Sequence, residues 1–86
     1  MKAIDKAIRM CDESSVLKFK AKNDFESTNL SNALKSYINN FYFVNVVSVT
    51  WDKAKNTYTA NCNYKNGYKN ELMVVIENYP VFEEWV

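Results

Sequence analysis

Histidine is absent from this chain of 86 residues, and glycine and proline occur only once each. Histidine is the side chain most suited to proton transfer near neutral pH, and it is a common zinc ligand. A single glycine cannot build the glycine-rich loop that surrounds phosphate groups in nucleotide-binding proteins. We therefore expect a protein that is not an enzyme and that holds no metal and no other cofactor.

Net charge is also small, because eleven basic side chains nearly balance ten acidic ones and leave +1. Such a balance argues against binding that depends on a broad charged surface. No apolar run is long enough to cross a membrane, and Lys2, Asp5, Lys6 and Arg9 interrupt the apolar core that a signal peptide needs. We expect a cytoplasmic protein without membrane contact.

Only two cysteines are present, Cys11 and Cys62. Each lies in an apolar pattern, Cys11 in a helical stripe and Cys62 on the inner side of an expected strand. Buried cysteine commonly serves as a small apolar residue, so we expect both in the core. A disulfide between them is the alternative.

Apolar and aromatic residues, by contrast, are plentiful, at 48% and 15% of the chain. This is enough for one modest core, so residues 1–86 are expected to form a single domain. Asparagine and lysine are also frequent. Together with scarce glycine and histidine, this usage is typical of AT-rich genomes, such as those of some phages and other mobile elements.

Two helices and a strand are expected in the first half. Residues 3–13 and 30–38 place apolar side chains at helical spacing, whereas residues 16–22 alternate apolar residues with lysines, as a half-buried strand does. The apolar positions are Ile4, Ala7, Ile8 and Cys11, then Leu17, Phe19 and Ala21, then Leu30, Ala33, Leu34, Tyr37 and Ile38.

Three strands are expected in the second half, at residues 41–51, 57–64 and 68–77, because these runs are rich in β-branched and aromatic residues. Loops of four residues (53–56) and three residues (65–67) would join them. This register places Phe43, Val47, Val49 and Trp51 inside and Tyr42, Val44, Val46, Ser48 and Thr50 outside. Pro80 ends the last strand, after which Phe82 and Trp85 would close the core or anchor a partner.

The resulting fold class is α+β, a two-layer sandwich with the order α-β-α-β-β-β. Two helices would cover one face of a curved, four-stranded antiparallel sheet whose last three strands form a meander.

The outer face of this sheet is the expected partner-binding surface, because contiguous apolar side chains on a surface commonly mark contacts. Its candidate residues are Tyr42, Val44, Val46, Met73 and Val75. Alternatively, a helix or the tail covers these residues, or the register is different.

Lys18, Lys20 and Lys22 form the only basic line. With Tyr42 and Tyr68 nearby, they could bind single-stranded nucleic acid, since aromatic rings stack on bases and lysines contact phosphates. The simpler interpretation is that the lysines protect an edge strand from unwanted pairing or are merely solvated.

Our leading hypothesis is therefore a small intracellular protein-binding module, such as a phage inhibitor or adaptor that covers a partner's surface. Single-stranded nucleic-acid binding and a homodimeric or larger structural role are the alternatives.

Overall fold

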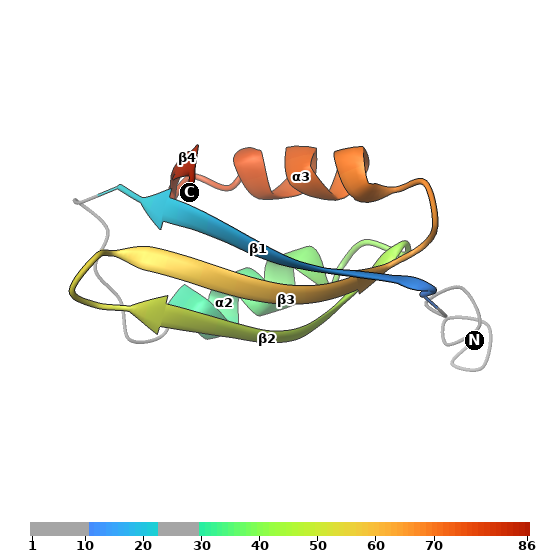
Figure 1. Ribbon diagram of the computed structural model, residues 1–86, viewed down its shortest axis with the longest axis horizontal. Coiled ribbons are helices and arrows are strands. Elements are labelled where there is room, and N and C mark those ends of the chain that lie inside the picture. Colours follow the sequence, from blue (N-terminus) through green and yellow to red (C-terminus); the bar gives the residue numbers. More distant parts are fainter. Residues whose placement is uncertain (1–10, 23–29) are drawn as a thin grey trace.

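The computed structural model describes residues 11–22 and 30–86. Its elements are β1 (Glu13–Ala21), α2 (Leu30–Ile38), β2 (Val44–Asp52), β3 (Thr57–Tyr64), α3 (Lys69–Glu77) and β4 (Phe82–Trp85). They form a four-stranded antiparallel sheet with two helices, which confirms the expected α+β class (Figure 1). Most of the helix expected over residues 3–13 lies outside the described residues, and Glu13 already belongs to β1.

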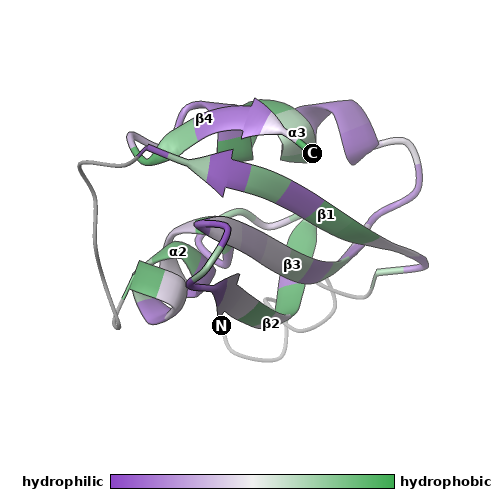
Figure 2. Cartoon of the chain, turned by 60° about the vertical axis from the view of Figure 1, so that its left-hand side comes forward, coloured by the Kyte–Doolittle hydropathy of each residue, from purple (hydrophilic) through white to green (hydrophobic). Residues whose placement is uncertain are grey.

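Strand β1 follows the alternation of its sequence. Leu17, Phe19 and Ala21 are buried, whereas Lys18 is exposed. Figure 2 shows the alternation of hydrophilic and hydrophobic residues along β1. β1 pairs with β3 along most of its length and with β4 at its end, so the strand order is β2-β3-β1-β4. β1 is therefore an interior strand of the sheet.

Strands β2 and β3 form a hairpin across the expected four-residue loop, because Asp52 pairs with Thr57. Asn56, the last loop residue, has a φ of 53°, a left-handed conformation that asparagine tolerates better than most residues. The boundaries of β3 match the expected strand.

A bulge in β2 overturns part of the predicted register. Val46 pairs with Cys62 and Ser48 pairs with Asn61, so Val47 is an extra residue without an opposite partner. The extra residue reverses the side-chain alternation at that point. Val44 and Val46 are consequently buried and Val47 is 55% exposed, the opposite of the expectation.

Residues 69–77 form helix α3, so the strand expected at 68–77 and the three-strand meander are wrong. Leu72, Val75 and Ile76 recur at helical spacing and all lie in the core. The run Val74–Ile76 is β-branched, which favours a strand only when a neighbouring strand is there to pair with it. Gly67 has the expected positive φ, 91°, but leads into a helix.

The fourth strand is instead supplied by the tail. In β4, Phe82 and Trp85 pack against Phe19 with ring centroids 5.4 and 6.1 Å away, as expected of residues that close the core. The indole Nε1 of Trp85 donates a hydrogen bond to Glu77 of α3 at 2.7 Å. β4 thus connects the end of the chain to the sheet by strand pairing and to α3 by a hydrogen bond.

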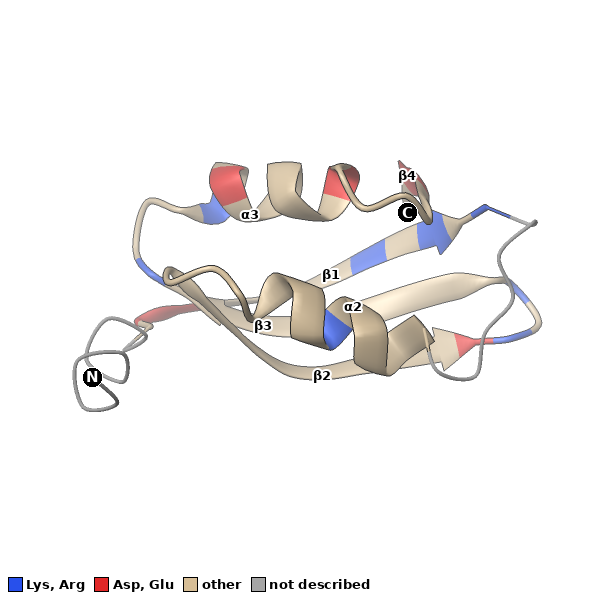
Figure 3. Ribbon diagram, turned by 180° about the vertical axis from the view of Figure 1, so that it is seen from behind, with Lys and Arg blue, Asp and Glu red and all other residues tan. Residues whose placement is uncertain are grey.

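Both helices lie on the same side of the sheet (Figure 3). The Tyr37 hydroxyl of α2 donates to the carbonyl of Val75 in α3 at 3.2 Å, and the rings of Tyr37 and Tyr79 lie 4.7 Å apart. The core lies between these helices and the inner sheet face, where Phe19 and Tyr58 are fully buried. No described element covers the outer face.

Candidate functional site

The predicted partner-binding residues do not form one surface. Val44 and Val46 have 0% and 3% exposure and belong to the core. Val75 is buried on α3, Met73 is half-buried on the same helix, and Tyr42 is 52% exposed just before β2. The bulge and the helix explain this difference, because they turn the valines inward and remove residues 73 and 75 from the sheet.

The three lysines lie at the end of β1, away from the tyrosines. Lys20 is opposite Thr57, whereas the other end of β1, Glu13, is opposite Tyr64, which leads toward Tyr68. Lys18 is opposite Thr59, and Glu84 of β4 lies beside Lys20. The expected basic and aromatic platform is therefore not assembled. Edge protection is also wrong as an explanation, because β4 covers β1 there.

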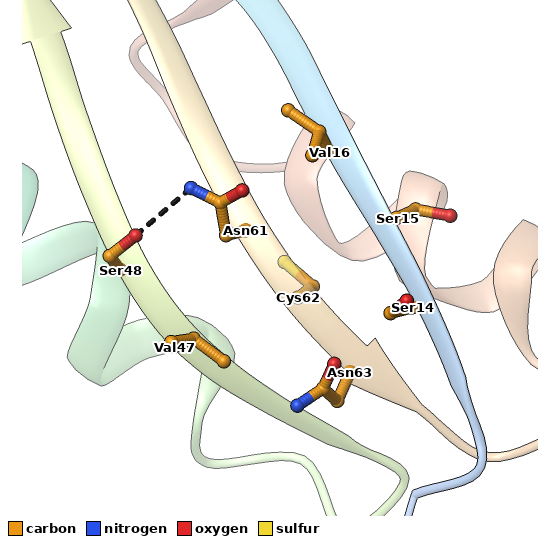
Figure 4. A pocket seen from close by; sticks show the side chains of 8 residues that line it. All are labelled: Ser14, Ser15, Val16, Val47, Ser48, Asn61, Cys62 and Asn63. Carbon is orange, nitrogen blue, oxygen red and sulfur yellow. Dashed lines mark hydrogen bonds between the residues drawn. The ribbon is translucent and has the colours of Figure 1, made fainter.

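The outer sheet face is polar and contains a groove of about 420 Å³ (Figure 4). Val16 and Val47, 59% and 55% exposed, stand on opposite sides of Asn61 in the central strand. The Asn61 amide donates to the Ser48 hydroxyl at 2.9 Å. The lining is completed by Ser14, Ser15, Cys62 and Asn63. The amides and hydroxyls on this face can form hydrogen bonds, but the described residues that line the groove include no carboxylate or ammonium group.

A second groove, of about 400 Å³, lies between α3 and the segment that joins α2 to β2. It is lined by Phe41, Phe43, Asn70, Glu71, Val74 and Val75, and we call it the α3 groove. Phe41 is held in place by backbone bonds to Ile38 and Val44. Because Val74 follows Glu71 by three residues, both side chains lie on one side of α3. The groove is mainly apolar, with a polar rim at residues 70 and 71.

An aromatic cluster adjoins the α3 groove. Tyr68 stacks on Phe43 at 4.9 Å, and its hydroxyl lies 2.9 Å from that of Tyr42. The hydrogen bond with Tyr68 is the main cause that raises the pKa of Tyr42 above its usual value, and the negative charge of Glu71 contributes. The negative charge of Glu71 is therefore felt by the aromatic cluster of Tyr42, Phe43 and Tyr68, and Phe43 also lines the groove.

Two further observations bear on chemistry. Burial raises the pKa of Cys62 to about 12, so this thiol is protonated at neutral pH and is a poor nucleophile. In residues 11–22 and 30–86, no group of three or more cysteine or acidic side chains is placed to hold a metal ion. Cys11 and Cys62 are not joined by a disulfide; the Cys11 thiol donates instead to the Phe43 carbonyl at 3.6 Å.

No family model, curated protein or solved structure matches this chain. Within the described ranges, no helix is long and apolar enough to span a membrane. The α3 groove was not predicted from the sequence, although the helical spacing of Leu72, Val75 and Ile76 could have indicated the helix that forms one wall. The groove itself depends on residues about 30 positions apart in the chain.

Proposed function

We propose that this domain binds a partner protein through the α3 groove and performs no chemistry on it, acting as an inhibitor or adaptor. The observation that carries the proposal is a concave apolar surface on which aromatic rings and an exposed valine meet. Phe41 and Phe43 form one side, and Val74, 51% exposed, forms the other.

Such a surface suits protein recognition for two reasons. Apolar side chains in a concave site gain most from removal of water when a partner's side chain enters, at about 25 cal/mol per Å² of buried apolar area. The polar rim at Asn70 and Glu71 then gives hydrogen bonds that orient the partner. Tyr42 adds an exposed aromatic ring beside the groove, and tyrosine is enriched in protein interfaces.

The test compares two valine variants of similar exposure. Val74→Lys introduces a charge into the α3 groove, whereas Val47→Lys introduces the same charge on the outer sheet face. We expect a protein captured from host lysate by the native chain to be lost with Val74→Lys and retained with Val47→Lys. The melting temperatures of both variants should stay close to that of the native chain.

Two results would contradict the proposal. Retention of the partner by Val74→Lys, together with loss by Val47→Lys, would move the binding surface to the outer sheet face. If a second copy of this chain occupied the groove, light scattering would detect a dimer, and Val74→Lys would dissociate it.

A further inference from the structure

Among the described residues, Glu71 is the only charged side chain that lines the α3 groove. It is exposed, and its carboxylate forms no hydrogen bond or ion pair with any residue of the described part of the chain. Unlike Glu77 on the same helix, which accepts a hydrogen bond from Trp85, Glu71 has its full hydrogen-bonding capacity available. A partner that enters the groove therefore meets an uncompensated negative charge.

The apolar side of the groove complements a particular kind of cation. Lysine and arginine have long hydrocarbon stems that pack on apolar surfaces while the charged group remains at the edge. Phe41 and Val74 offer most of that apolar surface, since Phe43 also lines the groove but is only 6% exposed, and Glu71 stands at its edge.

Aromatic rings strengthen this preference. A cation is attracted to the face of an aromatic ring within about 6 Å of its centre. Phe43 lines the groove and belongs to a cluster with Tyr42 and Tyr68, whose hydroxyls bond to one another. The negative charge of Glu71 on α3 acts on Tyr42, so the carboxylate and the rings lie in one neighbourhood. An acidic side chain would instead be repelled by Glu71.

We propose that the α3 groove accepts a lysine or arginine side chain of the partner protein, with the stem on Phe41, Phe43 and Val74 and the cationic group beside Glu71. This inference rests on the proposed function and specifies the chemistry of the partner residue. Lys69 precedes Glu71 by two positions on α3 but does not line the groove.

The experiment compares two small probes, N-acetyl-lysine N-methylamide and N-acetyl-norleucine N-methylamide. Both have a four-carbon side chain, and only the lysine probe carries an ammonium group at its end. Binding is followed by amide proton–nitrogen correlation spectra. We expect both probes to shift the signals of Asn70, Glu71 and Val74. The lysine probe should bind about two- to fivefold more tightly at low salt, the range expected of an exposed ion pair.

Two variants test the role of the carboxylate. Glu71→Gln should remove the advantage of the lysine probe and leave the norleucine probe unchanged. Glu84→Gln, an exposed change on β4, should keep the advantage. Added salt should reduce the advantage in the native chain, because salt screens exposed charges.

The outcomes separate this inference from the proposed function. Equal binding of the two probes, or an advantage that survives Glu71→Gln, would overturn the cation preference and leave the groove as an apolar binding site. Absence of shifts in the groove with both probes would contradict the groove as a binding site and the cation preference together.

Discussion

Asn56 and Ala21, which are 35 residues apart, are joined by two hydrogen bonds, in each of which a different residue is the donor. The Ala21 amide donates to the Asn56 carbonyl at 2.9 Å, and the Asn56 side-chain amide donates to the Ala21 carbonyl at 3.0 Å. The same side chain accepts a hydrogen bond from the indole of Trp51 at 3.2 Å. One loop residue thus joins the β2–β3 hairpin to the end of β1.

The Asn56→Gly variant tests this junction. Glycine adopts the positive φ of position 56 without strain, so the change removes the side-chain hydrogen bonds and little else. We expect the free energy of unfolding to fall by about 1–3 kcal/mol in urea denaturation. Lys55→Ala, an exposed change in the same loop, should alter it by less than about 0.5 kcal/mol. Equal effects of the two changes would contradict the role of Asn56.

The bulge in β2 is tested by placing lysine at two adjacent positions. Val46→Lys puts a charge in the core and should lower the free energy of unfolding by about 3 kcal/mol or more, or prevent folding. Val47→Lys places the same charge in solvent and should change it by less than about 0.5 kcal/mol. Thermal melting followed by circular dichroism distinguishes them. A larger loss of stability in Val47→Lys than in Val46→Lys would support the register without a bulge.

The Cys62 thiol should be unreactive in the folded protein. With Cys11 changed to serine, Cys62 is the only thiol. Its pKa of about 12 leaves about one thiol in ten thousand ionised at pH 8, and burial blocks access as well. We expect a colorimetric disulfide reagent to react with this variant only after denaturant is added. Rapid reaction of the folded variant would show that Cys62 is accessible.

The same pKa predicts how alkaline pH affects stability. Because the folded state raises the pKa of Cys62, the protonated thiol is favoured by folding, and its contribution is complete below the unfolded value of about 8.5. The free energy of unfolding should therefore fall as the pH rises from about 8.5 toward 12. Cys62→Ala should reduce this pH dependence in urea denaturation measured across that range.

Tyr58 offers a stabilising substitution. Its ring is fully buried, and its hydroxyl has no hydrogen-bond partner among the described residues. Because an unsatisfied buried hydroxyl is unfavourable, Tyr58→Phe should raise the free energy of unfolding by about 1 kcal/mol. Tyr64→Phe is the matched control: it removes a 2.9 Å bond to Ser15 and should lower the free energy of unfolding by about 0.5–1.5 kcal/mol. A loss of stability in Tyr58→Phe would show that its hydroxyl has a partner.

The tyrosine pair beside the α3 groove should be visible in a pH titration. The hydrogen bond with Tyr68 raises the pKa of Tyr42, so its phenolate should form at higher pH than in an unfolded chain. Tyr68→Phe should lower the pKa of Tyr42 by removing this bond, and Glu71→Gln should lower it to a smaller extent. Ring-carbon chemical shifts measured against pH check both. An unchanged pKa in Tyr68→Phe would contradict the pairing.

Local patterns were sufficient for β1, α2 and the β2–β3 hairpin. In β1 each apolar residue alternates with a polar one, so burying Phe19 exposes Lys18 whatever the partner strand is. In α2, Leu34 and Ile38 lie four residues apart and reach the core together. The loop of residues 53–56 followed from the alternation of inner and outer side chains in the runs on either side.

The candidate site could not be predicted in the same way. Both sides of the α3 groove depend on contacts between segments that are distant in the sequence. Residues 69–77 form a helix, and Phe41 lies against that helix. The prediction that Val44 and Val46 form an outer apolar surface was wrong for a related reason. One unpaired residue in β2 turns both side chains inward.

The sequence by itself determined the α+β class, the burial pattern of β1 and α2 and the hairpin loop, because these follow from the side-chain periodicity of single elements. Tertiary structure decided the bulge at Val47, the helical state of residues 69–77 and the choice of Phe82–Trp85 as the fourth strand. Each of these depends on which segments of the chain pair with β1 or β3 and on which side chains fill the core. The free energy of such pairing and burial exceeds the small local preference of β-branched residues for a strand.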